Sequence, residues 1–174
     1  MTATSTACFL LAATLALAAG LAQAAETPKA ELIGTFKDWT AASFEEEAGK
    51  GCFVVSVPKK SEGKYRRRDP TYVHVTHRPA MKTRDVVSVT AGYTYKPDST
   101  VKVTIGDESF TLFTKEGAAW ANDALDARLV EAMKKAGTMV VEGTSSRGTL
   151  TTDTYSLAGF GDAYDAISKA CPPQ

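Results

Sequence analysis

Six basic residues lie within ten positions and form the clearest candidate for binding chemistry in this sequence. Segment 59–68 contains a single acidic residue, Glu62. Lysine and arginine attract phosphate, sulfate and carboxylate groups, so such a loop suits an anionic lipid, a lipopolysaccharide phosphate, a sulfated glycan or a host surface. The alternative is a solvated loop that keeps a long connection soluble, with the acidic run 45–47 neutralising its charge. The six candidates are Lys59, Lys60, Lys64, Arg66, Arg67 and Arg68.

A second polar surface is predicted where a turn meets a threonine-rich strand. Gly148 suits the positive φ of a tight turn. Strand alternation then places positions 149, 151 and 153 on one face. Threonine is good strand material and also a hydrogen-bonding surface, so either a purely structural role or the docking of a polar ligand is open. The residues of this second-choice binding face are Arg147, Thr149, Thr151 and Asp153.

Patterns for catalysis or metal binding are weak. The sequence has no G-x-S-x-G, HExxH or CxxC motif. Its two histidines, His74 and His77, are three positions apart, which puts them on opposite faces of a strand. We therefore expect a non-enzymatic protein without catalytic residues, cofactor or metal site. Paired carboxylates distant in sequence leave a hydrolase open as an alternative.

The N-terminal segment is typical of a cleaved signal peptide. Residues 7–22 are almost unbroken in apolar character, but this run is shorter than the roughly 20 residues of a membrane span. Ala22-Gln23-Ala24 gives the small-x-small pattern that signal peptidase recognises. We expect a signal peptide at residues 1–24 and a mature domain at residues 25–174 without a transmembrane segment. A retained anchor is the alternative.

Charge and cysteine content limit the class of the mature chain. It carries all 20 basic and all 20 acidic residues, and this net charge of zero argues against a dedicated nucleic-acid binder. Its length is that of one domain able to bury a core. Only Cys52 and Cys171 follow the signal segment. We expect them to pair in an oxidising compartment, with two buried free thiols as the alternative.

Period-two alternation runs through most of the mature chain and predicts strands. Tight turns between adjacent strands favour antiparallel pairing. Apolar stripes predict two helices, Asp123–Ala136 and Gly161–Ala170, and the second stripe turns Cys171 toward the sheet. The fold class is therefore mainly β: a single-domain antiparallel β-sandwich or partly open barrel with two short packed helices. The expected strands are Leu32–Trp39, Cys52–Val57, Thr71–Arg78, Val86–Tyr95, Thr100–Ile105, Glu108–Thr114, Thr138–Gly143 and Thr149–Leu157.

Four stretches resemble the motifs of one bacterial family. Phe36–Trp39 resembles an opening F-x-D-W strand, and Cys52–Lys59 resembles a C-F-h-h-S-x-P-K segment, where h is hydrophobic. Tyr72–Pro79 resembles V-x-V-T-x-R-P, and Gly143–Phe160 (GTSSRGTLTTDTYSLAGF) is the longest motif. On these motifs the chain resembles the invasion-associated locus B (IalB) family of Gram-negative, mainly alphaproteobacterial, exported proteins.

The resemblance implies export to the periplasm, the cell surface or the medium, and a role of some members in host-cell invasion. It supplies no catalytic residue or cofactor. Many members have a cysteine soon after the opening tryptophan, where this chain has Ala41, Ala42 and Ser43. We therefore expect an exported, non-enzymatic envelope protein that acts by binding, with host-cell interaction as one role. The alternative is a periplasmic structural or stress-tolerance factor that binds envelope proteins.

Overall fold

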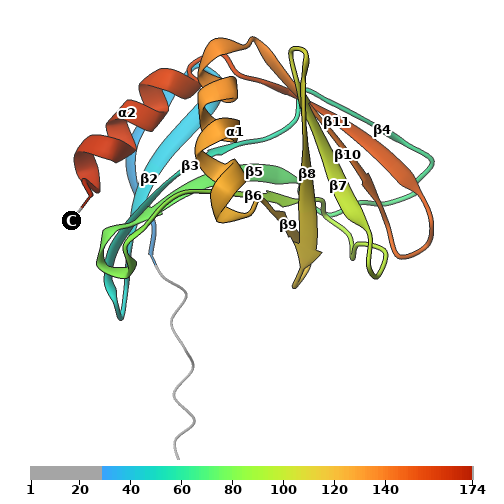
Figure 1. Cartoon of the computed structure of the whole chain (residues 1–174), viewed down its shortest axis with the longest axis horizontal. Coiled ribbons are helices and arrows are strands. Elements are labelled where there is room, and N and C mark those ends of the chain that lie inside the picture. Colours follow the sequence, from blue (N-terminus) through green and yellow to red (C-terminus); the bar gives the residue numbers. More distant parts are fainter. Residues whose placement is uncertain (1–28, 174) are drawn as a thin grey trace, which may run out of the picture.

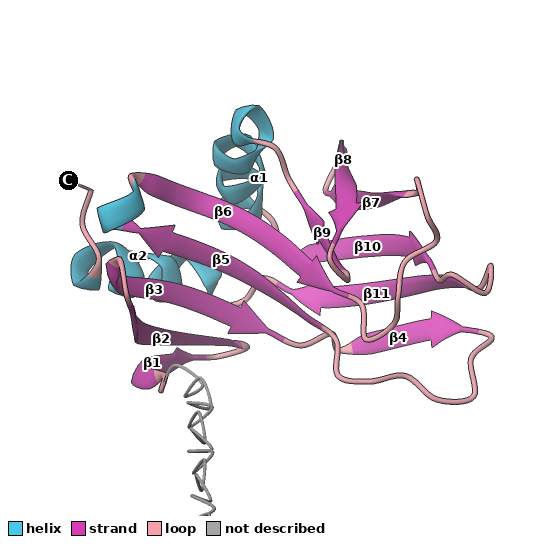
Figure 2. Ribbon diagram, turned by 90° about the horizontal axis from the view of Figure 1, so that it is seen from below, coloured by secondary structure: helices cyan, strands magenta, loops and turns pink. Residues whose placement is uncertain are grey.

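A strongly curved antiparallel sheet of eleven strands, with two α-helices packed on it, makes up the computed structural model of residues 29–173 (Figures 1 and 2). The spatial order of the strands is β1-β2-β3-β5-β6-β9-β8-β7-β10-β11-β4. The expected signal peptide, residues 1–24, lies outside the described residues. The elements are β1 (Glu31–Phe36), β2 (Trp39–Glu46), β3 (Gly49–Ser56), β4 (Lys60–Gly63), β5 (Tyr72–Arg78), the 3₁₀ helix η1 (Pro79–Met81), β6 (Thr83–Thr90), β7 (Thr100–Ile105), β8 (Glu108–Lys115), β9 (Ala118–Trp120), α1 (Asp123–Lys135), β10 (Thr138–Thr144), β11 (Leu150–Ser156) and α2 (Phe160–Ala170).

The sheet is not closed, but the chain joins its two halves where β3 leads into β4. β3 lies between β2 and β5, whereas β4 forms the far edge beside β11. The Lys59 amide donates to the Thr154 carbonyl at 2.8 Å, and Trp39 Nε1 donates to the Ser156 carbonyl at 3.0 Å. These bonds hold the start of β2 and the end of β3 beside β11. The prediction of a mainly β fold with two short helices, sandwich-like or partly open barrel, is confirmed.

The core lies on the inner face of the curved sheet, as the period-two pattern predicts. In β7, Val101 and Val103 are buried and Lys102 between them is exposed. α2 covers β1, β2 and β3, while α1 packs on β6 and β8. Trp39 is fully buried, and its ring lies 4.8 Å from that of Phe160 on α2. Each such large apolar side chain contributes about 1.5–3 kcal/mol on burial. Neither of the described helices combines the length and apolar character needed to cross a bilayer.

The N-terminal strand prediction was wrong in its extent. The expected strand 32–39 is two strands, because a turn with Lys37 at φ 52° separates β1 from β2. β2 then continues to Glu46, so most of the acidic run 45–47 lies on a strand and not in a loop. The register pairs Glu46 with Gly49 across the β2–β3 hairpin. Only the geometry of the turn at Lys37 separates β1 from β2. The sequence has no glycine or proline there to mark the turn.

Further differences concern short or interrupted strands. The strand expected to run to Tyr95 ends at Thr90. The long connection 58–70, expected to be a loop, contains β4, and the three-residue β9 was also not predicted. Every residue of β4 is exposed, and its sequence, KSEG, shows no apolar alternation. It is a strand because its backbone pairs with β11.

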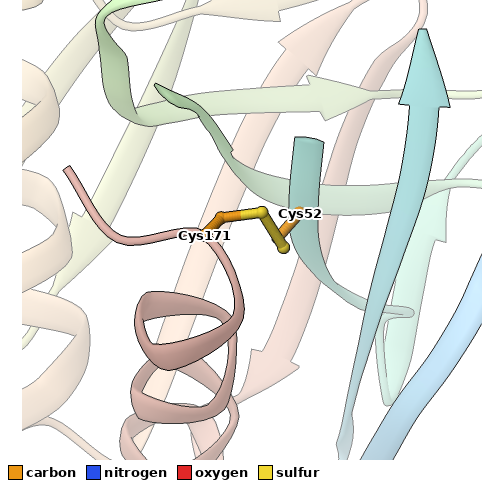
Figure 3. The surroundings of a disulfide bond; sticks show 2 residues. All are labelled: Cys52 and Cys171. Carbon is orange, nitrogen blue, oxygen red and sulfur yellow. A yellow bond between two sulfur atoms is a disulfide. The ribbon is translucent and has the colours of Figure 1, made fainter. Parts of the chain in front are cut away.

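Cys52 and Cys171 form a disulfide, which confirms the predicted pairing (Figure 3). Their Cα atoms are 6.0 Å apart, and the bond spans 119 positions of sequence. Both cysteines are buried. Cys171 directly follows α2, whose Ile167 is buried on the same face. The bond therefore fastens the end of α2 to β3.

Asp126 is a buried carboxyl on the inner side of α1 and gives the fold a pH dependence. Its Oδ1 accepts a hydrogen bond from the Val87 amide at 2.9 Å. Burial raises the pKa of Asp126 to about 6, although the Val87 hydrogen bond opposes the rise. The folded pKa therefore exceeds the unfolded value of about 3.9. The stabilisation from protonated Asp126 is fully present below about pH 4 and is lost as the pH rises through about 6.

We expect the free energy of unfolding of the wild type to fall relative to Asp126→Asn by up to about 3 kcal/mol between about pH 4 and pH 7. Urea denaturation of both proteins at a series of pH values measures this difference. Asp165→Asn is the control for the loss of a carboxyl group, because Asp165 is exposed on α2 and is not among the charges that shift the pKa of Asp126. Parallel pH profiles of the wild type and Asp126→Asn would contradict the prediction.

Candidate anion-binding site

The two binding surfaces predicted from the sequence meet at one cavity of about 700 Å³. Its lining comes from segment 64–69, from residues 92–94 and from the β10–β11 turn with the start of β11. Free cationic side chains come from two of these parts. The cationic lining residues whose side chains form no ion pair within residues 29–173 are Lys64, Arg66, Arg67 and Arg147.

Arg68 is buried below this surface and holds segment 64–69 against the sheet. Its Nη1 donates to Asp153 Oδ1 at 2.7 Å and its Nη2 to Oδ2 at 2.5 Å. The two side chains are only 5% and 3% exposed. Nε donates to the Ala91 carbonyl at 2.5 Å, so the guanidinium fork is well satisfied. Burial disfavours the charge of Arg68, but the hydrogen bonds and the charge of Asp153 outweigh burial and raise the arginine pKa.

Two tyrosines lie against the Arg68 guanidinium. The ring centroids of Tyr65 and Tyr93 are 5.6 and 5.1 Å from its central carbon, within range of cation–π attraction. The Tyr93 hydroxyl shares a 2.7 Å hydrogen bond with Thr151 Oγ1. Burial raises the pKa of Tyr93, so its hydroxyl stays protonated at neutral pH. The Arg68–Asp153 pair thus also positions the aromatic lining of the cavity.

Gly92 lets the loop approach the sheet closely. The Asp69 amide donates to the Gly92 carbonyl at 3.0 Å. Gly92 has φ +68°, and a Cβ there would lie 2.0 Å from the Asp69 carbonyl oxygen. Glycine alone combines this dihedral with this approach. The same residue follows the end of β6, which explains why the strand does not reach Tyr95.

Gly92→Ala should displace segment 64–69 and lower the free energy of unfolding by about 1–3 kcal/mol. We expect faster hydrogen exchange at the Asp69 amide, because its acceptor moves. Gly117→Ala is the matched control: Gly117 also has a positive φ, but a Cβ there meets nothing within 4 Å. Gly117→Ala should lower the free energy of unfolding by about 1 kcal/mol and leave hydrogen exchange at the Asp69 amide unchanged. Equal exchange at Asp69 in both variants would overturn this account of the loop.

Lys59 and Lys60 do not line the cavity. Lys59 Nζ lies 2.5 Å from Asp38, and Lys60 Nζ lies 2.9 Å from Glu62. The structure therefore brings four of the six predicted basic residues to the cavity, and one of these four, Arg68, is neutralised by Asp153. Glu46 of the acidic run 45–47 does not neutralise segment 59–68, because its Oε1 lies 3.1 Å from Nε of Arg78.

The residues of the second-choice face divide between the cavity and the interior. Arg147 is exposed, Thr149 is half-buried, and both line the cavity. Thr151 also lines it but is only 2% exposed. Asp153 is equally buried and bonds to Arg68 instead of facing solvent. Within the described part of the chain, the face therefore contributes to the cavity one cation without an ion pair, Arg147, together with hydroxyl groups.

Several lining residues were missed by the sequence reasoning. Tyr65 lies within the basic segment, and an aromatic residue between cations was a signal that could have been used. Gly92 interrupts an alternating pattern, which is the sign of a bulge or a close backbone approach. Tyr93 follows it and was predicted only as part of the strand Val86–Tyr95. Ser145 and Ser146 precede Arg147 in the β10–β11 turn, but neither was among the predicted binding residues.

The histidines lie away from the cavity. His74 has ring contacts with Phe53 and Tyr72, at centroid distances of 5.1 and 4.8 Å, and burial lowers its pKa to about 4. It is therefore uncharged at neutral pH. His77 is buried, with Nε2 3.1 Å from Asp85 Oδ1. Residues 29–173 contain no group of three or more side chains arranged to hold a metal ion.

Comparison with known proteins places the chain in a family. No curated protein and no solved structure matches it. The family model described as Invasion associated locus B (IalB) protein matches residues 39–168. The match extends from the first residue of β2 into α2, and it includes both the basic segment and the β10–β11 turn. The chain therefore belongs to the invasion-associated locus B family.

Proposed function

We propose that this IalB-family protein is an exported, non-enzymatic envelope protein that binds an anionic ligand in the cavity between segment 64–69 and the β10–β11 turn. One observation carries the proposal. Cationic side chains from two segments about eighty positions apart converge on one cavity, while the arginine beneath them is neutralised by a buried carboxylate. Among residues 29–173, the cavity cations that form no ion pair are Lys64, Arg66, Arg67 and Arg147.

Local charge and shape both support anion binding. The whole chain has zero net charge, so the cavity is a local concentration of positive charge and not part of a generally basic surface. A concave site lined by one sign of charge focuses its field on a ligand. Of the residues that the structure describes, Asp69 is the one acidic residue in the lining, whereas glycoside hydrolysis canonically uses two carboxyl groups. This lining supports binding over hydrolysis.

The sequence and the family support the proposed export and biological setting. The expected signal peptide, residues 1–24, and the disulfide both fit an oxidising compartment outside the cytoplasm. We propose the periplasm or the cell surface as the location. Host-cell interaction is the proposed role where the anionic ligand is displayed by a host membrane or glycan.

An edge strand favours a second candidate function. β1 is a sheet edge, and Leu32 on it is 69% exposed. An open edge with an apolar side chain can accept a strand from another protein. This feature supports the alternative of a periplasmic structural or stress-tolerance factor that binds envelope proteins. Binding of that kind would resist high salt.

The test is binding of the oxidised mature protein, residues 25–174, to phosphatidylglycerol vesicles, to lipopolysaccharide and to host-cell membranes. A salt series from about 50 to 500 mM separates charge-dependent from apolar binding. We expect affinity for at least one of these to fall with salt. We also expect it to drop at least about tenfold in the cavity variant. That variant combines Lys64→Gln, Arg66→Gln, Arg67→Gln and Arg147→Gln.

A control variant removes the same charge from outside the cavity. It combines substitutions by glutamine at four exposed lysines, and it should retain most of the wild-type affinity. An equal loss in both variants would show a non-specific charge effect, and absence of binding at every salt concentration would overturn the anionic-ligand proposal. The control positions are Lys59, Lys60, Lys115 and Lys135.

A further inference from the structure

We infer that the ligand of this cavity is a saccharide bearing phosphate groups, an inference that rests on the proposed anion-binding function and specifies its ligand. The size of the cavity is the first argument. At about 700 Å³ it lies within the range of small-molecule sites, about 300–1,000 Å³, and far exceeds the space needed by a lone phosphate. The ligand therefore has a substantial body in addition to its charge.

The lining between the cations indicates the chemistry of that body. Thr94, Ser146 and Thr149 contribute hydroxyls, and within residues 29–173 these three side chains form no hydrogen bond to another residue. A hydroxyl both donates and accepts, so it matches the hydroxyl groups of a sugar ring. The described lining includes no leucine, isoleucine, valine, methionine or phenylalanine. An acyl chain would find no apolar wall there.

Aromatic residues complete a surface suited to a sugar ring. Tyr65 lines the cavity and is 38% exposed, so part of it is open to a ligand. Tyr93 lines it as well and is fixed by Arg68 and Thr151. Tyrosine offers an apolar ring face together with a polar end. Sugars present the same combination of C–H faces and hydroxyl edges.

The cations fall into two groups, which suits two phosphate groups on one scaffold. Lys64, Arg66 and Arg67 come from the connection after β4, whereas Arg147 comes from the β10–β11 turn. Arginine forks bind phosphate oxygens in pairs. The nearby exposed apolar residue Leu150 is absent from the lining and alternates with Thr149 and Thr151 along the strand. The cavity is therefore built for a polar headgroup and not for an inserted lipid tail.

The test compares four probes by isothermal titration with the oxidised mature protein. They are a β-1,6-linked glucosamine disaccharide with two phosphate groups and no acyl chains, the same disaccharide without phosphate, inorganic phosphate, and phosphatidylglycerol vesicles. We expect the phosphorylated disaccharide to bind at least about tenfold more tightly than either the plain disaccharide or inorganic phosphate. A fifth probe, a lipid-linked form of the same phosphorylated disaccharide, should bind equally well because the headgroup alone is recognised.

Tyr65→Ala separates sugar recognition from charge. It should weaken binding of the phosphorylated disaccharide at least threefold and leave inorganic phosphate binding unchanged, whereas Tyr72→Ala, outside the cavity, should change neither. Inorganic phosphate or vesicles binding as tightly as the phosphorylated disaccharide would overturn the saccharide inference and leave the anion-binding function standing. Failure of all anionic probes would overturn both.

Discussion

Replacing Arg68 by methionine should lower the free energy of unfolding by about 3–5 kcal/mol and remove ligand binding at the cavity. The substitution leaves the Asp153 carboxylate buried without its partner and takes the hydrogen bond from the Ala91 carbonyl. It also removes the anchor of segment 64–69 and the cation between Tyr65 and Tyr93. Urea denaturation followed by circular dichroism measures the loss of stability.

A second arginine–carboxylate pair on the same sheet is the control. Arg78 and Glu46 are 3.1 Å apart, but their side chains are 32% and 27% exposed. Arg78→Met should therefore cost about 1 kcal/mol or less. Arg68→Met/Asp153→Leu should recover much of the stability lost in Arg68→Met, because no charge is left buried, yet it should still bind poorly. If Arg68→Met lowers the free energy of unfolding no more than Arg78→Met does, the Arg68–Asp153 pair does not organise the site.

Removing the disulfide is the change with the next largest expected effect. Cys52→Ser/Cys171→Ser should lower the free energy of unfolding by about 2–5 kcal/mol. The bond spans 119 positions, for which the chain-entropy estimate is about 5 kcal/mol. α2 should remain docked in the folded variant because Phe160 and Ile167 are fully buried. Thermal and urea denaturation in the absence of reductant measure the loss.

Reductant provides the control for this prediction. It should lower the unfolding midpoint of the wild type toward that of Cys52→Ser/Cys171→Ser and leave the variant unchanged. Anion binding should persist in the folded variant, since neither cysteine lines the cavity. An identical midpoint for the oxidised wild type and the variant would show that the bond does not constrain the unfolded chain.

Elements with a strong local pattern were predictable from sequence. β7 has the predicted bounds, Thr100–Ile105, because its alternation is regular and turns flank it. α1 begins after the Asn122 cap, whose side chain accepts from the Leu125 amide as that residue type favours. β4 could not be found in this way. Its side chains are all exposed, and its conformation depends on backbone pairing with a strand some ninety positions away.

The two parts of the candidate site, the basic segment and the face that begins at Arg147, could be located from the sequence. That they line one cavity could not be predicted. Arg68 and Asp153 are 85 positions apart, and nothing local reveals that they are partners. One physical clue was available: Asp153 falls on the same strand face as the buried Tyr155, and a carboxylate on an inner face requires a cationic partner. Lys59 and Lys60 lie away from the cavity because β4 pairs with β11. Their charge alone does not distinguish them from the basic residues that line the cavity.

The most direct test of the central claim is a map of the ligand on the protein. ¹⁵N-labelled, oxidised mature protein would be titrated with the doubly phosphorylated glucosamine disaccharide while amide chemical shifts are recorded. The claim predicts that amides of segment 64–69, residues 92–94 and residues 145–149 shift together with one binding curve. Shifts confined to another surface, such as the β1 edge, or absent from one of the two cationic segments, would contradict a single anion-binding cavity.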